Sequence, residues 1–391
     1  MFHDYPFMIS ALTIILLLTA VASATSPPNY NESLLLPQNM PYLRRDTNSS
    51  VLNNTTSNTT SGSESFLWII QDTYDQSNFF DSFSFFTGDD PTHGTVNYVD
   101  KATAFAHNLS YISWDGKVMM KGDDTNTLQT GQYRESVRVS SNTLYNTGLF
   151  ILDINRAPWG CGVWPAFWTL GNGQWPATGE IDIIEGVHDN EHNQVTWHTS
   201  AASNFTGTIV RQNNQPYLNC EGSGTLPGCG VIEWSQASYG PTFDAQGGGI
   251  FAMKWDRDGI SVWNFYRVAI PKDILAGTPN PATWPNPTAT LEPAGCDPLK
   301  YFVNHSIVFD ITFCGDWAGN SYATSGCPGT CADRLVDPTN FVNASWSINW
   351  LKVYRRQNVV GVVSASAPPL AMRLPLLLAI ATMTAFGLNV L

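Results

Sequence analysis

The sequence predicts an all-β fold, a β-sandwich of the jelly-roll kind, and three observations support this prediction. Short segments of alternating apolar and polar residues recur through residues 65–356 and are separated by turn-forming residues. Charged residues make up only 13% of the chain, whereas glycine, proline and aromatic residues are plentiful. No part of this region shows a sustained amphipathic helical period. We expect residues 65–356 to form one domain, because all-β sandwiches of this size are common.

The clearest alternating patterns lie at residues 133–139, 250–255, 260–265 and 346–354. Side chains alternate between the two faces of a strand, so each segment would present one face to a core and the other to solvent. All four are predicted to be half-buried antiparallel strands. The region contains no internal repeat and no glycine-rich phosphate loop followed by a helix.

A fifth segment, Glu180–Glu185, reads EIDIIE and carries three carboxylates between two glycines. Its isoleucines would also cluster on one side of a helix, so periodicity alone does not decide its structure. The segment is short, bounded by glycine and rich in β-branched residues, which favours a strand. In a regular strand Glu180 and Asp182 share a face and Glu185 lies on the other. A β-bulge at Ile183-Ile184 would return Glu185 to the same face.

Three carboxylates on one face indicate a catalytic site. Four effective strand steps separate the Cα atoms of Glu180 and Glu185 by about 13 Å, and a concave strand with inward-leaning side chains would bring the carboxyl groups much closer. A separation of roughly 5–5.5 Å is what a retaining glycosidase needs between its nucleophile and its acid/base. A solvated acidic edge strand and a divalent-metal site are the alternative interpretations of the same segment.

The N-terminus predicts secretion. An apolar run, residues 7–21, is followed by Ala22-Ser23-Ala24, a pattern typical of signal-peptidase cleavage, so residues 1–24 are predicted to be a signal peptide. The residues before the run contain no Lys or Arg, which is atypical.

Residues 25–64 are rich in Ser, Thr and Asn and are predicted to be a disordered, glycosylated segment. The glycosylation sequons are at Asn31, Asn48, Asn53, Asn54, Asn58, Asn108, Asn204, Asn304 and Asn343.

The C-terminus predicts membrane attachment. Small residues and a short spacer precede an apolar tail, Leu374 to Leu391. This order is typical of a GPI-attachment signal with Ser364 or Ser366 as the ω site, and residues 357–391 are assigned to a linker and that signal. A tail-anchored helix is the alternative, because the tail is just long enough to span a bilayer. We expect a secreted protein at the cell surface or in the cell wall, attached to the plasma membrane only through the GPI anchor.

The composition of the chain limits the classes of partner that it can bind. The net charge of −13 disfavours binding to nucleic acid and other polyanions, because like charges repel. A neutral polymer would not be repelled. The chain has 14 tryptophans, and amphipathic indole rings suit the apolar faces of sugars. Trp159, Trp164, Trp168 and Trp175 crowd the approach to the carboxylates, although core packing is the commoner role of any single tryptophan. A polysaccharide is the expected partner, and we expect a monomer.

Seven cysteines lie between Cys161 and Cys331. In an oxidising compartment they would form up to three disulfides and leave one cysteine over, a candidate free buried thiol. Cys327 and Cys331 lack a matching His or Cys pair, and no acidic loop has the ligand spacing of a calcium site. We predict neither a metal nor a cofactor.

Two neighbouring motifs, WPAFW at residues 164–168 and WPATGEIDIIEG at residues 175–186, closely resemble those of glycoside hydrolase family 16. The similarity is to the branch of fungal endo-1,3(4)-β-glucanases, the laminarinase-like enzymes. Further matches are FFTGDDPT at 85–92, RESVR at 134–138, GGGIFAM at 247–253 and FCGDWAG at 313–319. The ExDxxE motif resembles the bulged laminarinase-type strand rather than the shorter ExDxE of lichenases and wall transglycosylases.

The resemblance implies a concanavalin A-like jelly roll with a concave substrate cleft and a retaining double displacement on 1,3- or mixed 1,3/1,4-β-D-glucans. It makes Glu180 the nucleophile and Glu185 the general acid/base, with Asp182 hydrogen-bonded to Glu180. The expected sugar contacts are Trp164, Trp175, His198 and Trp317. For His198, a packed strand histidine is an equal alternative.

Two positions depart from the family pattern. Relatives often carry a cysteine near Ser203, so Cys220 or Cys229 is expected to lack a partner. Trp197 stands where a smaller aliphatic residue is expected, which puts the nearby subsite and the linkage preference in question.

Two other functions stay open. A GPI-anchored cell-wall β-glucan transglycosylase would share the first chemical step and pass the glycosyl group to another sugar. Predicted membrane attachment favours this function, and the bulged motif opposes it. A non-catalytic wall adhesin is disfavoured by the three intact carboxylates.

Overall fold

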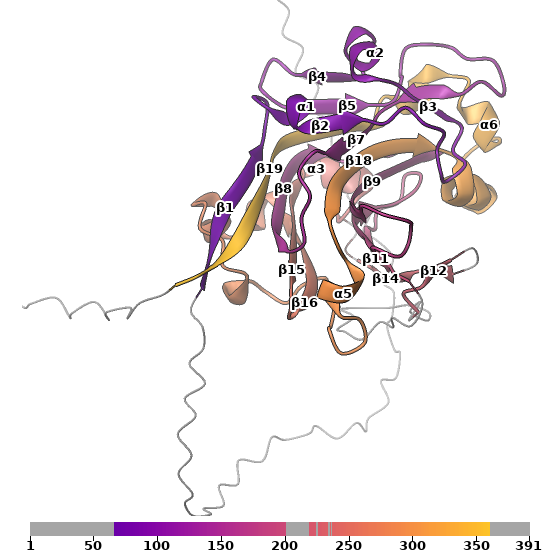
Figure 1. Ribbon diagram of the computed structural model, residues 1–391. Helices are drawn as coiled ribbons and strands as arrows, with labels where there is room; N and C mark the ends of the chain where they lie inside the picture. Colours follow the sequence, from indigo (N-terminus) through magenta and orange to yellow (C-terminus); the bar gives the residue numbers. More distant parts are fainter. Residues whose placement is uncertain (1–65, 201–218, 224–225, 234, 236, 360–391) are drawn as a thin grey trace, which may run out of the picture. The chain divides into compact units, whose positions relative to one another are not determined.

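The computed structural model describes residues 66–200, 219–223, 226–233, 235 and 237–359, and two antiparallel β-sheets contain most of its strands (Figure 1). Across the eight-stranded sheet the order is β17 (Ala289–Leu291), β16 (Gly259–Tyr266), β15 (Gly249–Asp256), β8 (Gly148–Arg156), β19 (Ser345–Asn358), β5 (Val118–Lys121) and β4 (Ser110–Ile112), with β1 (Phe66–Tyr74) also paired to β19. Across the seven-stranded sheet it is β14 (Cys229–Ile232), β11 (Gln194–His198), β10 (Glu180–Glu185), β9 (Val163–Gly171), β18 (His305–Phe313), β7 (Arg138–Ser141) and β2 (Phe83–Phe85).

Short elements connect these strands. Two ribbons pair β12 (Gly222–Ser223) with β13 (Leu226–Pro227) and β3 (Val96–Tyr98) with β6 (Arg134–Ser136). The α-helices are α1 (Phe79–Ser82), α2 (Lys101–Ala106), α3 (Gly240–Ala245), α4 (Lys272–Leu275), α5 (Pro298–Tyr301) and α6 (Cys331–Arg334). The other helical turns are η1 (Arg267–Ala269), η2 (Pro281–Thr283), η3 (Gly315–Gly319), η4 (Tyr322–Thr324) and η5 (Pro338–Phe341). None of these helices exceeds six residues, as expected from the lack of a helical period.

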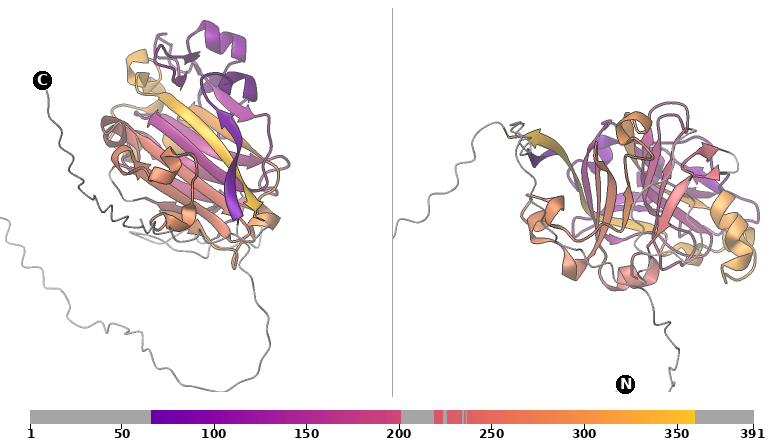
Figure 2. Two further views of the ribbon diagram at one scale, coloured as in Figure 1. Left: turned by 90° about the vertical axis from the view of Figure 1, so that its left-hand side faces the viewer. Right: turned by 90° about the horizontal axis from the view of Figure 1, so that it is seen from below.

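The core lies between the two sheets, which pack face to face (Figure 2). Phe167 of β9 stacks on Phe309 of β18 with ring centroids 4.7 Å apart. Phe309 also meets Trp346 of β19 edge-on at 5.5 Å, so aromatic contacts join one sheet to the other. The predicted β-sandwich is confirmed.

Most of the predicted strands are present. Residues 250–255 and 260–265 fall within β15 and β16, residues 346–354 fall within β19, and Glu180–Glu185 is a strand rather than a helix. The prediction of a single strand over residues 133–139 is wrong, because the chain changes partners at Val137. β6 pairs in parallel with β3, whereas β7 lies between β18 and β2.

Several predictions concern residues that the structure does not describe. Residues 1–65 and 360–391, with the predicted signal peptide, glycosylated segment and GPI signal, lie outside the described ranges, as do Ser203 and Asn204. Among the residues that are described, no helix combines the length and apolar character needed to cross a bilayer.

Candidate active site

The bulge in β10 brings the three carboxylates to one face of the seven-stranded sheet. Asp182 pairs with Trp168 of β9 and the next pair joins Ile184 to Phe167, so β10 has one extra residue at this point. The register with β11 shifts over the same stretch. The predicted bulge is thus confirmed, and the isoleucines of β10 are fully buried on the core side.

The amide of Asn193 holds this bulge in place. Its Oδ1 accepts a hydrogen bond from the backbone N–H of Glu185 at 3.0 Å, and its Nδ2 donates to the backbone carbonyl of Ile183 at 2.9 Å. The bulge leaves backbone groups without ladder partners, and one fully buried side chain satisfies two of them. Sequence reasoning missed Asn193, because nothing in its local pattern distinguishes it.

Each carboxylate has its own hydrogen-bond partner. The indole Nε1 of Trp175 donates to Glu180 Oε2 at 2.5 Å, and that of Trp164 donates to Glu185 Oε1 at 2.9 Å. His198 Nε2 lies 3.1 Å from Asp182 Oδ2. The structure therefore places three of the four predicted sugar contacts directly against the three carboxylates.

Burial and mutual repulsion shift the protonation of this cluster. Burial, followed by the charge of Glu180 and a hydrogen bond with it, raises the pKa of Asp182 well above its ordinary value. Burial and the charge of Asp182 raise the pKa of Glu185 well above its ordinary value, against the hydrogen bond from Trp164, which lowers it. Asp182 and Glu185 therefore keep their protons to higher pH than ordinary carboxyl groups.

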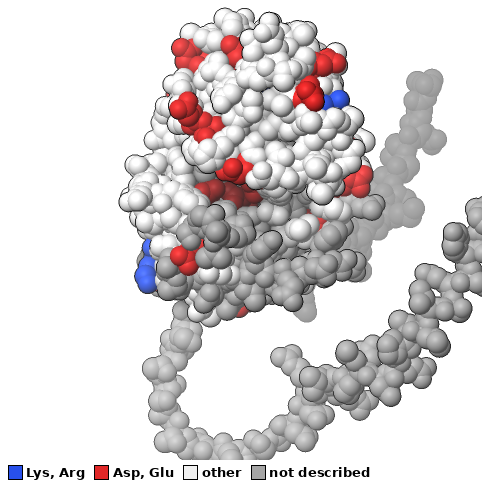
Figure 3. Space-filling view, turned by 90° about the vertical axis from the view of Figure 1, so that its right-hand side faces the viewer, with Lys and Arg blue, Asp and Glu red and all other residues white. Residues whose placement is uncertain are grey.

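One face of the molecule has an acidic hollow. In Figure 3, turned to the side on which β9 and β11 lie in Figure 1, acidic side chains gather in a hollow near the middle of the molecule. This hollow suits a neutral polymer and opposes an anionic one, in agreement with the net charge of the chain.

A second ionic group lies beside the cluster on the same face. Asp310 of β18 is buried and accepts a hydrogen bond at 3.1 Å from the backbone N–H of Ala166, the residue that pairs with Glu185. Arg138 faces Asp310 from β7, and its guanidinium packs 4.9 Å from the ring of Trp168. Burial raises the pKa of Asp310 to about 7, opposed by the charge of Arg138. No local pattern in the sequence marks Asp310 as a site residue.

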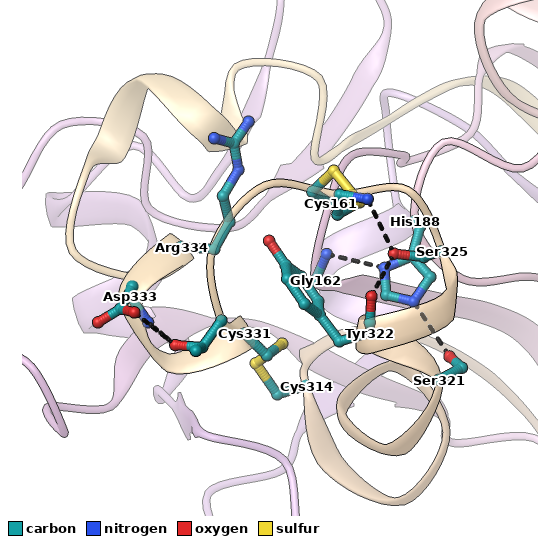
Figure 4. Close-up of a disulfide and its surroundings, with 12 residues drawn as sticks. Cys161, Gly162, His188, Cys314, Ser321, Tyr322, Ser325, Cys331, Asp333 and Arg334 are labelled. Atoms are coloured by element: carbon teal, nitrogen blue, oxygen red, sulfur yellow. Dashed lines mark hydrogen bonds between the residues drawn. A yellow bond between two sulfur atoms is a disulfide. The ribbon is translucent and has the colours of Figure 1, made fainter.

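Trp317, the fourth predicted sugar contact, lies on η3 and meets the ring of Trp164 edge-on, with centroids 5.8 Å apart. Two disulfides tie the region around η3 to neighbouring segments: Cys314–Cys331 and Cys161–Cys327 (Figure 4). Trp317 therefore reaches the site through a cross-linked loop that packs beside the first strand residues of β9.

His188 holds the loop that carries Trp317 in place through hydrogen bonds of its ring (Figure 4). Burial lowers the pKa of His188, which favours the neutral ring. Its Nδ1 accepts from the backbone N–H of Gly162 at 3.1 Å, so its Nε2 can donate to Ser321 Oγ, 3.1 Å away. Ser321 Oγ in turn donates to the backbone carbonyl of Trp317 at 2.7 Å.

His198 and Trp175 approach one another beside two glycines. Their ring centroids are 6.0 Å apart. A Cβ at Gly228, whose φ is +82°, would lie 2.6 Å from His198 Nδ1, and a Cβ at Gly222 would lie 2.9 Å from the Trp175 ring. Both positions need glycine because the two rings occupy the space of a side chain.

One group of site residues could hold a cation. Oxygen and nitrogen atoms of Glu180, Asp182 and His198 lie within 4.8 Å of one another. A second group with such spacing contains Cys161 and Cys327, which are joined in a disulfide and are not available as thiolate ligands.

Two expectations drawn from departures in the sequence are wrong. Cys220 and Cys229 are bonded to each other, and the seventh cysteine outside the three disulfides is the buried Cys296. Trp197 is fully buried, because it faces the core opposite Ile181 in the β10–β11 ladder. Its size therefore changes packing behind the sheet and not the surface that a substrate would meet.

Comparison with known proteins agrees with this geometry. Residues 83–354 match the family described as the XgeA-like, catalytic GH16 domain. A Schizosaccharomyces pombe protein named a probable glycosidase is 43% identical over 292 residues, which cover 72% of this chain and 68% of that protein. The endo-1,3(4)-β-glucanase of Arthroderma benhamiae is 38% identical, with 74% of this chain and 65% of that protein covered. The match to endo-1,3(4)-β-glucanase xgeA of Emericella nidulans covers only 47% of that protein.

Solved structures give the same result. GH16 Laminarinase 16A from Phanerochaete chrysosporium, solved with β-glucans in its donor and acceptor sites, is 41% identical with a TM-score of 0.70 and covers 74% of this chain and 99% of that one. An elongating GH family 16 β-1,3-glucosyltransferase is 37% identical with a TM-score of 0.69 and covers 74% and 100%. The chain therefore belongs to glycoside hydrolase family 16, among the XgeA-like catalytic domains.

Proposed function

We propose that this protein is a retaining endo-β-glucanase that hydrolyses 1,3- or mixed 1,3/1,4-β-D-glucans. The observation that carries the proposal is the bulge that brings Glu180, Asp182 and Glu185 to one face of a strand. The names of the A. benhamiae and P. chrysosporium relatives support the substrate class.

In the first step Glu180 attacks the anomeric carbon and protonated Glu185 donates its proton to the leaving glycosidic oxygen. Because the pKa of Glu185 is raised well above its ordinary value, Glu185 keeps that proton to higher pH than an ordinary glutamic acid. The hydrogen bond from Trp175 stabilises the carboxylate form of Glu180, which the attack requires.

In the second step Glu185, now a carboxylate, removes a proton from water as the water oxygen attacks the anomeric carbon. The bond to Glu180 breaks, Glu180 leaves as a carboxylate, and the sugar regains its original configuration. Trp164, Trp175, His198 and Trp317 are proposed to contact the sugars on either side of the bond that breaks.

Parallel digestion of laminarin, lichenan and barley β-glucan tests the proposal. Proton NMR of the first products should show the β-anomer, and Glu180→Gln should lose at least about a thousandfold in kcat. Release of reducing ends by Glu180→Gln at the rate of the parent protein would contradict the assignment.

A transglycosylase is the second candidate, and the elongating glucosyltransferase among the relatives favours it. The glycosyl-enzyme would then be attacked by a sugar hydroxyl in place of water. A labelled acceptor oligosaccharide separates the two: label in products longer than the acceptor indicates transfer, and its absence indicates hydrolysis.

We also propose that the protein is secreted and carries a GPI anchor at the cell surface or in the wall. Three disulfides support an oxidising compartment. Phosphatidylinositol-specific phospholipase C should release the protein from intact cells, and Ser364→Leu/Ser366→Leu should abolish attachment.

A further inference from the structure

Trp114 is the most exposed large apolar residue among the residues described, at 98%. It lies in the tight turn between β4 and β5, where the backbone N–H of Gly116 bonds the carbonyl of Ser113 at 3.0 Å. Ser113 Oγ also donates to Asp115 Oδ1 and accepts from the backbone N–H of Lys117. An ordered turn thus presents the whole indole to solvent, two residues after Ile112, which is also exposed.

This turn is one wall of a groove on the eight-stranded sheet. The groove has a volume of about 580 Å³, within the range of ligand sites. Tyr111, Met119 and Ser347 form one row across β4, β5 and β19. The neighbours of Met119 along β5 are buried in the core, so this row lies on the outer face of its sheet. The carboxylates lie on the outer face of the other sheet, and the groove is separate from them.

The far side of the groove is polar and fixed. Lys117 Nζ donates to Asn349 Oδ1 at 2.5 Å, and Asn155 Nδ2 donates to the same oxygen at 3.0 Å. Asn349 Nδ2 donates to Asp153 Oδ1 at 2.6 Å, and Asp153 is paired with Arg267. Amides and charges that bond one another leave a surface with donors and acceptors but with little charge available to an ion.

These features select a class of ligand. An exposed indole beside a tyrosine suits the apolar face of a pyranose ring, and the polar side suits its hydroxyl groups. A phosphate or nucleic acid is disfavoured, because Asp115 adjoins the groove and the ammonium group of Lys117 is engaged. A hydrophobic protein partner is disfavoured by the network of amides and charges.

We propose that this groove is a second binding site for β-glucan, which holds a chain of the polymer while another chain is cut at the carboxylates. The proposal rests on the proposed function for the identity of the polymer. Its consequence is specific: the groove matters on insoluble glucan, where the enzyme must stay on a surface, and not on a short soluble oligosaccharide that fills only the cleft.

Depletion binding to insoluble β-1,3-glucan particles tests the proposal, with the full mature protein carrying Glu185→Gln so that the particles are not degraded. In this background Trp114→Ala and Tyr111→Ala should each weaken binding by at least about fivefold. Tyr133→Ala is the matched control, since Tyr133 is an aromatic residue exposed to 61% that does not line the groove. It should bind like the parent.

Hydrolysis of a soluble laminari-oligosaccharide by proteins with Glu185 intact is the second measurement. Trp114→Ala should keep the parental rate there and lose rate on the particles, which also shows that the variant is folded.

Equal particle binding by Trp114→Ala, Tyr111→Ala and the parent would overturn the groove site. A protein mass that halves in Trp114→Ala would instead identify an interface between copies and also overturn it. A parent that binds particles through Trp114 but cleaves no glucan would contradict the proposed function and leave the groove site standing.

Discussion

The indole of Trp164 sets the proton affinity of Glu185, at the scale of single residues. Its N–H stabilises the carboxylate form and lowers the pKa of Glu185 against the larger effect of burial. Trp164→Phe removes the donor and keeps an aromatic ring. We expect the pKa of Glu185 to rise, so that the acid stays protonated to higher pH and the alkaline limb of kcat/KM moves upward. A pH–rate profile on a soluble oligosaccharide measures the shift.

Asp182→Asn should shift the alkaline limb of kcat/KM in the opposite direction from Trp164→Phe. The charge of Asp182 raises the pKa of Glu185, so its removal should lower that pKa and bring the alkaline limb to lower pH. Shifts of the limb in the same direction for Trp164→Phe and Asp182→Asn would contradict this account of the cluster.

The sequence could predict those site residues that lie close to one another along the chain. Glu180, Asp182 and Glu185 lie on one strand, so strand alternation and one bulge were enough to group them. Asn193 reaches the site from the connection between β10 and β11, and Asp310 reaches it from β18. Their contribution depends on ladder register and burial, which no local pattern encodes.

At the scale of the element, the bulge in β10 depends on one side chain. Asn193→Ala leaves the N–H of Glu185 and the carbonyl of Ile183 without their partner, at a cost of about 1–3 kcal/mol in the free energy of unfolding for each group. A small displacement of Glu185 should lower kcat by about a hundredfold.

The control for this variant is Asn190→Ala. Asn190 lies in the same connection between β10 and β11, and its side chain bonds the backbone of His192. We expect it to keep nearly the parental kcat. Loss of kcat to the same degree in both variants would show that the whole connection matters and that the amide bridge does not.

The strand predictions are correct where a segment pairs with the same neighbouring strand over its whole length. β15 and β16 form a hairpin in register over their full length, and the alternating pattern follows directly from it. Residues 133–139 alternate equally well, yet the chain leaves β3 for β18 at Val137. Partner exchange is a tertiary property, so alternation could not reveal it.

At the scale of the whole molecule, buried acids should make the fold more stable at mildly acidic than at alkaline pH. Burial raises the pKa of Asp310 to about 7 and that of Glu233 to about 8. Carboxyls of an unfolded chain titrate near pH 4, so the folded state binds these protons more tightly. This stabilisation is complete below about pH 4 and is lost as pH rises to the folded-state pKa values.

His305 acts in the opposite direction. Burial lowers its pKa to about 4, so the unfolded chain takes up a proton first as pH falls below about 6.5. Burial lowers the pKa of His188 as well, and it raises the pKa values of Asp182 and Glu185 in addition to those of Asp310 and Glu233. The buried acids therefore outnumber the two histidines. We therefore expect a higher midpoint of thermal unfolding at about pH 5 than at about pH 8.

Asp310→Asn provides the check, because it keeps an acceptor for the N–H of Ala166 and removes the titrating group. The difference between the two midpoints should narrow in this variant and stay unchanged in Asp89→Asn, an exposed position. A difference that is the same in all three proteins would exclude Asp310 as a source of the pH dependence.

The pairing of β1 with β19 has a consequence for protein engineering. Phe66 lies opposite Asn358, and residues paired across antiparallel strands are about 5 Å apart. A few glycines would bridge that gap, so the two ends of the catalytic unit can be fused. New ends could then be opened in the exposed turn at Ala276-Gly277, giving a circularly permuted enzyme whose cleft strands stay unbroken.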